Sequence, residues 1–171
     1  MSVGESGTKW ECRCSRHSGL KERKEQMFLN QYHHFFDDKG RLTIPAKFRE
    51  LPAEGAFVVP GFDRNLMVLP PAVFQIIYDR LNAMSLTDPD ARLLRQIILG
   101  NALMVVPDAS HRILLSQNLR DYAGLQNEVV FVGQGDYFEL WAAEPWHMQE
   151  DKINDAEMNA KRFTALDLRT R

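Results

Sequence analysis

The fold is decided by the stretch Asp37-Asp38-Lys39-Gly40-Arg41-Leu42-Thr43-Ile44-Pro45-Ala46-Lys47-Phe48-Arg49-Glu50. This stretch predicts a charged turn, a half-buried strand with alternating polar and apolar residues, and a short helix that begins at Pro45. Gly40 suits the turn because glycine adopts a positive φ without steric strain. The aromatic-rich segment from Phe28 to Phe36 predicts a strand that leads into the turn.

A second stretch, Asp108-Ala109-Ser110-His111-Arg112-Ile113-Leu114-Leu115-Ser116-Gln117-Asn118-Leu119-Arg120-Asp121, repeats this pattern. Each copy is followed by two strand-like segments separated by a turn, at 57–69 and at 129–141. An order of strand, turn, strand, short helix, hairpin and helix that occurs twice is typical of a tandem duplication. We therefore expect two related units that share the basic turn.

Two helices are predicted between the copies. The second begins with Asp88 as its N-cap and Pro89 in its first turn, and its Leu93–Ile98 stripe is expected to be core or subunit interface. The segment after Glu150 is expected to be a weak helix or a disordered tail. The predicted organisation is a disordered extension (1–26), a first repeat (27–74), connecting helices (75–101), a second repeat (102–146) and a polar C-terminal tail (147–171).

The composition is that of a soluble globular protein. The chain has 171 residues, of which 44% are hydrophobic and 26% are charged. No apolar run approaches the ~20 residues of a membrane span, and residues 1–26 lack the apolar core of a secretory signal, so we expect a cytoplasmic location. Cys12 and Cys14 are expected to be free thiols, because their spacing suits neither a disulfide framework nor a zinc site. We expect no metal and no cofactor.

The net charge of −2 argues mildly against a nucleic-acid partner, but the distribution of charge matters more. A locally basic patch on an acidic chain binds phosphates usefully only when several copies act together. Such a patch surrounds the first turn, where basic residues outnumber acidic ones: Lys39, Arg41, Lys47 and Arg49 against Asp37, Asp38 and Glu50.

The Asp37–Glu50 stretch resembles the SpoVT/AbrB-type swapped-hairpin domain. Its duplication, together with Leu86-Thr87-Asp88-Pro89-Asp90-Ala91-Arg92 between the copies, resembles the MraZ family. The resemblance implies an α+β, mainly β fold of tandem swapped-hairpin AbrB-like units that form a pseudo-dimeric barrel with short helices. It also implies a nucleoid-associated transcriptional regulator of the bacterial division and cell-wall gene cluster, a repressor that binds direct repeats in double-stranded DNA as a ring-shaped homo-oligomer.

The family's Asp-x-x-x-Arg motif corresponds to Asp37 and Arg41 in the first copy, and to Asp108 and Arg112 in the second. An arginine suits bidentate contact with phosphate or with a guanine edge, whereas an aspartate would be repelled by DNA and is expected to orient the turn. We therefore predict two sets of residues: DNA-binding Lys39, Arg41, Lys47, Arg49 and Arg112, and turn-orienting Asp37, Gly40 and Asp108.

The second copy departs from the motif. Ser110-His111 replaces the basic residue and the glycine, and Ser116 replaces the proline. His111 would be strained if the turn needs a positive φ there, so the second turn is expected to keep its structural role and to contribute less to DNA contact.

Three alternatives compete with the DNA interpretation. The arginines could form purely structural ion pairs with the aspartates four residues earlier. The chain could be a protein-interaction or scaffold ring that does not bind DNA. An enzyme is the third possibility, because Asp108, Ser110 and His111 are neighbours, but near neighbours on one turn point apart and cannot form a triad. No nucleotide-binding fingerprint and no Gly-Ser self-cleavage pair is present in the sequence, so neither catalysis nor a small-molecule substrate is expected.

Overall fold

The computed structural model of the chain describes residues 27–49, 51, 54–164 and 166. The predicted extension 1–26, with its two cysteines, lies outside the described residues. No helix in the described part combines the length and hydrophobicity needed to cross a membrane. In chain order, the elements are β1 (Gln31–Phe35), β2 (Arg41–Thr43), the 3-10 helix η1 (Ala46–Phe48), β3 (Ala56–Pro60), β4 (Leu66–Leu69), α1 (Pro71–Ala83), α2 (Pro89–Ile98), β5 (Leu103–Val105), β6 (Arg112–Leu114), α3 (Gln117–Tyr122), β7 (Glu128–Gly133), β8 (Phe138–Ala142), α4 (Ala143–Asn154) and α5 (Ala156–Arg162).

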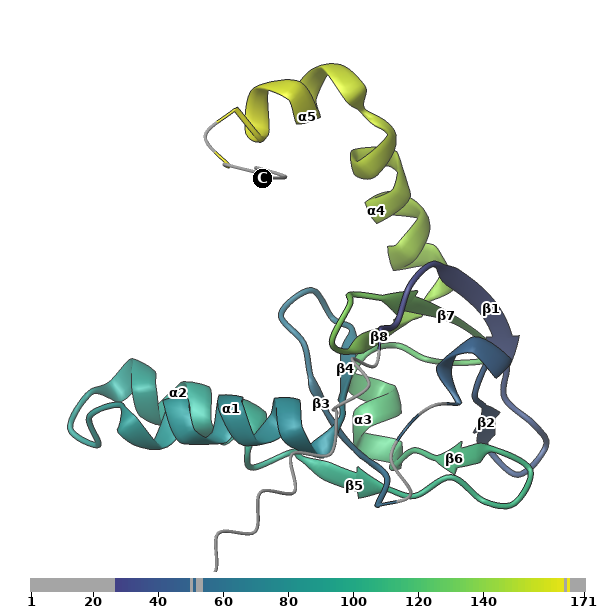
Figure 1. Cartoon of the computed structure of the whole chain (residues 1–171), viewed down its shortest axis with the longest axis horizontal. Coiled ribbons are helices and arrows are strands. Elements are labelled where there is room, and N and C mark those ends of the chain that lie inside the picture. Colours follow the sequence, from purple (N-terminus) through teal and green to yellow (C-terminus); the bar gives the residue numbers. More distant parts are fainter. Residues whose placement is uncertain (1–26, 50, 52–53, 165, 167–171) are drawn as a thin grey trace, which may run out of the picture.

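The main sheet interleaves the two halves of the chain. Six strands form one antiparallel sheet in the order β1-β7-β8-β4-β3-β5 (Figure 1). The edge strand from each half pairs with the hairpin of the other half: β1 with β7, and β5 with β3. If β1, β3 and β4 are exchanged with their counterparts β5, β7 and β8, the same strand order results, read from the other edge of the sheet. The two halves are therefore related by an approximate two-fold axis through the β4–β8 pair.

The strands that follow the two turns form a separate ribbon. β2 pairs with β6 in antiparallel register, with Leu42 opposite Ile113 at the centre. Arg41 is opposite Leu114, and Arg112 is opposite Thr43. The ribbon therefore has the same approximate two-fold symmetry as the sheet, and each turn lies at one end of it.

The sheet is not closed into a barrel among the described residues, because β1 and β5 are its two edges and pair only on one side. The mixed α and β content, with mostly antiparallel sheet and several short helices, confirms the coarse fold prediction. The pseudo-dimeric barrel and the predicted domain boundaries stay predictions.

A cluster of aromatic rings lies within the core between the sheet and the ribbon. Phe48, which follows the first turn on η1, is fully buried and packs edge-on against Phe28 and Tyr32, with ring centroids 5.4 and 5.2 Å apart. Its ring also lies 4.9 Å from that of Phe138 on β8. Leu119 is the corresponding buried residue on α3. The short helix after each turn therefore anchors that turn to the common core.

The helices between the repeats form a hairpin that projects from the sheet (Figure 1). As predicted, Asp88 caps α2, and its carboxylate accepts a hydrogen bond from the Asp90 N–H. Arg95 joins the two helices by donating to the carbonyls of Leu81, Asn82 and Met84. Of the predicted apolar stripe, Ile98 is buried, whereas Leu93 at the outer side is exposed.

The C-terminal segment is helical as far as Arg162. Of the two predicted alternatives for the segment after Glu150, a weak helix or a disordered tail, the helix is correct for the end of α4 and for α5. Trp146 at the start of α4 packs edge-on against Trp141 of β8, with ring centroids 5.5 Å apart, and this contact attaches α4 to the sheet.

Candidate functional site

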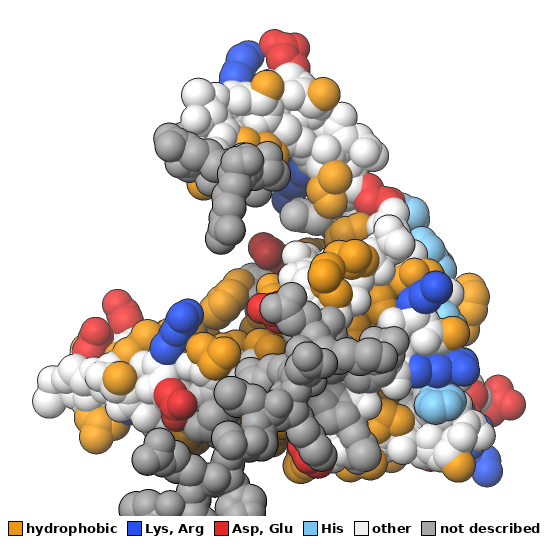
Figure 2. Space-filling model, viewed as in Figure 1, with side chains coloured by type: hydrophobic (Ala, Val, Ile, Leu, Met, Phe, Trp, Pro, Cys, Tyr) orange, Lys and Arg blue, Asp and Glu red, His pale blue; other side chains and the backbone are white. Residues whose placement is uncertain are grey.

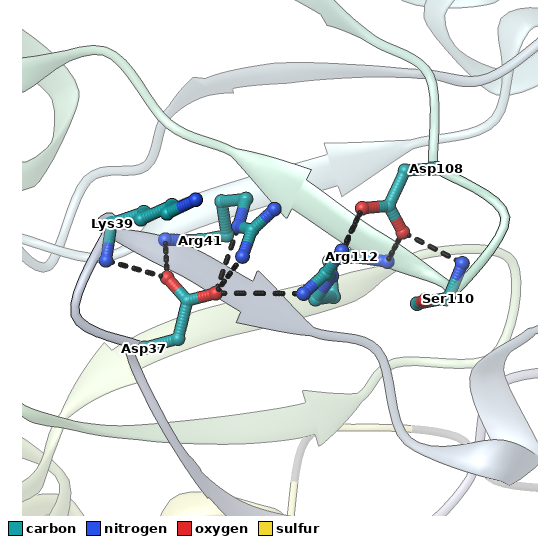
Figure 3. A network of polar contacts seen from close by, with 6 residues as sticks. All are labelled: Asp37, Lys39, Arg41, Asp108, Ser110 and Arg112. Atoms are coloured by element: carbon teal, nitrogen blue, oxygen red, sulfur yellow. Dashed lines mark hydrogen bonds and ion pairs between the residues drawn. The ribbon is translucent and has the colours of Figure 1, made fainter.

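The first turn is held together by the carboxylate of Asp37 (Figure 3). Its Oδ1 atom accepts hydrogen bonds from the backbone N–H groups of Lys39 and Arg41, both at 2.9 Å. Its Oδ2 atom accepts from Nε of Arg41 at 2.8 Å and pairs with Nη2 at 2.7 Å. The Gly40 N–H donates to the Asp37 carbonyl, and Gly40 has a φ of +69°. One carboxylate thus shapes the turn and also orients the arginine.

The second turn reproduces this geometry although its sequence has changed. Asp108 Oδ1 accepts from the N–H groups of Ser110 and Arg112 at 2.8 and 2.9 Å. Asp108 Oδ2 binds Nε and Nη2 of Arg112 at 2.9 and 2.8 Å. His111 has a φ of +57°, so it adopts the left-handed conformation that a glycine would adopt without strain. Asp108 thus bonds to its turn and to its arginine in the same way as Asp37.

Both arginines lie on the outward face of the β2–β6 ribbon. Side chains alternate between the two faces of a strand, and Leu42 and Ile113 at the centre of the ribbon are buried. Arg41 and Arg112, one residue away on each strand, therefore project on the opposite side. Figure 2 shows Lys, Arg and His side chains gathered with acidic ones at the side of the molecule that carries β1, β2 and β6 (right).

A further ion pair links the two turns. Nη1 of Arg112 lies 3.8 Å from Oδ2 of Asp37, the oxygen that already binds Arg41 (Figure 3). The Arg41 side chain, assisted by the backbone N–H groups of the turn, lowers the pKa of Asp37 to about 2. Arg112 likewise lowers the pKa of Asp108. Both carboxylates are therefore ionised at neutral pH, and each keeps its arginine in place.

The other predicted basic residues are less tightly organised. The side chains of Lys39 and Lys47 are exposed. Arg49, also exposed, donates from Nε to the Ile44 carbonyl at 3.2 Å. Burial of His34, and then the positive charge of Arg49, lower the pKa of that histidine. The structure places all three cations near the ribbon, and their role in DNA binding stays a prediction.

Arg120 is the residue of this site that the sequence did not indicate. It lies on α3 of the second half, yet its guanidinium packs over the ring of Phe36, with Cζ 5.7 Å from the ring centroid, next to Gly40. Its position relative to Asp108 equals that of Arg49 relative to Asp37. This correspondence between the repeats was the signal that could have identified it.

The second turn does not show the geometry of a catalytic triad. The contacts of Ser110 and His111 with Asp108 are made by backbone N–H groups. Within the described ranges, neither side chain forms a hydrogen bond or an ion pair, and no cluster of three or more His, Cys, Asp or Glu residues suits a metal ion. What the site offers chemically is a pair of oriented guanidinium groups on an exposed ribbon.

Comparison with known proteins shows which family the sequence matches. Residues 27–97 and 98–169 each match the family model described as "MraZ protein, putative antitoxin-like". A protein named "Transcriptional regulator MraZ" from Herpetosiphon aurantiacus is 43% identical over 129 residues, which cover 75% of this chain and 90% of that protein. Proteins of the same name from Thermomicrobium roseum and Corynebacterium glutamicum are both 41% identical, over 74% and 76% of this chain and 89% and 91% of their own.

Proposed function

The chain belongs to the MraZ family and carries two tandem domains of that family, and on this premise we propose that it is a transcriptional regulator that binds duplex DNA. The observation that carries the proposal is the outward face of the β2–β6 ribbon. There, Arg41 and Arg112 are held by Asp37 and Asp108, which lie at opposite ends of the ribbon. Relatives are named as regulators, which is not an enzyme class.

The ion pairs of the two turns are compatible with DNA contact. A guanidinium has five N–H donors in a planar fork, and the aspartate occupies only the Nε and Nη2 side of Arg41. The Nη1 side remains available among the described contacts, and the fixed fork costs less conformational entropy when it binds a phosphate or a guanine edge. The structural ion pair, which the sequence raised as an alternative to DNA binding, would thus prepare the arginine for it.

A single ribbon on a chain with a net charge of −2 would bind DNA weakly. We therefore propose that several copies act together as a ring-shaped homo-oligomer on direct repeats upstream of the division and cell-wall gene cluster, where binding represses transcription. Linked copies raise the effective concentration of each further turn, so affinity grows without any new type of contact.

The proposal is tested by fluorescence anisotropy with labelled DNA from upstream of the protein's own gene cluster. Affinity of the parent protein should fall steeply between ~50 and ~200 mM salt. Arg41→Ala should weaken binding by roughly tenfold or more, and Arg112→Ala by less. Arg80→Ala, on the exposed side of α1, serves as the matched control. Light scattering should show the same oligomer for all variants, and parental affinity of Arg41→Ala would disprove the site.

One observation favours the second candidate function, a protein-interaction or scaffold ring. Apolar side chains are exposed on both helical projections, among them Ile76, Leu86 and Leu93 on α1–α2 and Met148 and Ile153 on α4. If the protein assembles and binds a partner chain but shows no salt-dependent DNA binding, this alternative holds.

A further inference from the structure

We propose that Arg120, from the second repeat, contributes a phosphate-binding charge to the first turn, so that the DNA contact of the first turn is built by both repeats. This inference rests on the proposed DNA-binding function. It adds a residue from α3 to a site otherwise made of residues around β2.

The guanidinium of Arg120 lies against the tip of the first turn. A Cβ atom placed on Gly40 would be 2.9 Å from Nη1 of Arg120 and 3.6 Å from its Cζ. The cation also packs over the ring of Phe36, within the range of a cation–π contact. Nη2 donates to Oε1 of Gln117 at 2.6 Å, which holds the group in this position.

Arg120 differs from Arg41 and Arg112, the two arginines of the turns, because no carboxylate among the described residues forms an ion pair with it. Arg41 and Arg112 each form ion pairs, whereas Arg120 forms none with any described residue. Its Nε atom is buried and makes no hydrogen bond with the described part of the chain. A half-buried guanidinium without an anion is costly, and a DNA phosphate at the turn would supply the missing negative charge.

The counterpart arginines of the two repeats differ in their hydrogen bonds. Arg49 is the counterpart of Arg120, but its Nε bonds to the Ile44 carbonyl, and it makes no hydrogen bond or ion pair with the second turn among the described contacts. His111, with its side chain, occupies the position that corresponds to Gly40. Of the two counterparts, Arg120 is therefore the one whose Nε atom makes no hydrogen bond among the described contacts.

The test measures how DNA affinity depends on salt for Arg120→Met and Arg120→Lys. Methionine keeps an apolar stem over Phe36 but removes the charge, whereas lysine keeps the charge. Each phosphate contact contributes about 0.9 to the slope of log affinity against log salt. Arg120→Met should lower affinity about tenfold and reduce the slope by about 0.9 for each turn engaged. Arg120→Lys should keep the parental slope.

The controls separate this inference from simple packing and from the proposed function. Arg80→Met makes the same change at a remote position and should leave affinity and slope unchanged. If Arg120→Met lowers the melting temperature but keeps the parental slope, Arg120 only packs and the inference is wrong. Arg120→Gln carries the same test if the methionine variant does not fold. Failure of the parent protein to bind DNA would instead disprove the proposed function.

Discussion

Oδ2 of Asp37 lies 2.7 Å from Nη2 of Arg41 in its own repeat and 3.8 Å from Nη1 of Arg112 in the other repeat. No corresponding pair joins Asp108 to Arg41 among the described ion pairs. The two turns therefore have similar internal bonds but unequal surroundings. The carboxylate of the first turn is thus close to two guanidinium groups, and that of the second turn is close to one.

Replacing Asp37 should change how stability depends on pH. Because the folded-state pKa of Asp37 is lowered to about 2 from 3.8, its carboxylate stabilises the fold above pH 3.8 and loses this effect as the pH falls toward 2. Asp37→Asn should thus be less stable than the parent at pH 7, and the difference should vanish near pH 2. Urea unfolding across this range measures it. Asp151→Asn, an exposed change on α4, is the control, and parallel pH profiles for parent and Asp37→Asn would contradict the prediction.

Gly40→Ala should destabilise the protein more than Gly124→Ala. Both glycines have a positive φ, of +69° and +63°, so each alanine costs about 1–2 kcal/mol of unfolding free energy. Only at Gly40 does the added Cβ also meet Nη1 of Arg120, since nothing lies within 4 Å of the corresponding point at Gly124. Chemical denaturation compares the two. Equal losses would show that Arg120 simply moves aside.

His111→Gly should stabilise the protein by about 0.5–1 kcal/mol. The histidine has a φ of +57°, and removing its Cβ relieves more strain than the added freedom of glycine in the unfolded chain costs. The midpoint of urea unfolding should rise with an unchanged slope. A lower midpoint would mean that the histidine side chain makes a stabilising contact that outweighs the strain.

Truncation of the core residue behind each turn should be severely destabilising. Phe48→Ala should cost about 3–5 kcal/mol and Leu119→Ala about 2–5 kcal/mol, because both side chains are buried in the core that the two halves share. Phe62→Ala provides the control, since that ring is 71% exposed and its loss should change stability by less than about 0.5 kcal/mol. Denaturant unfolding measures all three variants. A small loss at Phe48 would indicate that the core collapses around the gap.

Local sequence patterns predicted most of the elements. Alternating residues identified the strands, and the Asp88-Pro89 pair identified the start of α2. The bonds of Asp37 were also predictable, because an aspartate that precedes a turn commonly accepts its N–H groups. Such features depend on residues only a few positions apart.

Features that depend on distant residues were not predicted from the pattern itself. The sequence of β1 does not indicate that it pairs with β7, because the residue pattern of a strand does not specify which other strand it pairs with. The contact between Arg120 and Gly40 likewise arises from the interleaving of the two repeats. The C-terminal α4 and α5 were ambiguous because many of their side chains are exposed, which leaves only a weak periodic signal.

The exchange of edge strands has a consequence for how the protein is made. β1 pairs with β7, and Gln31 is opposite Val132. This pair cannot form until Val132 has been synthesised, about a hundred residues after Gln31. At about 5–20 residues per second, a ribosome needs roughly 5–20 seconds to bridge that interval. During this time β1 and β4 of the first repeat lack their partner strands β7 and β8, and their edges are unpaired. We therefore expect the ordered β2–β6 ribbon to form only when most of the chain has been translated, so that a chain terminated before β6 lacks the surface that we propose binds DNA.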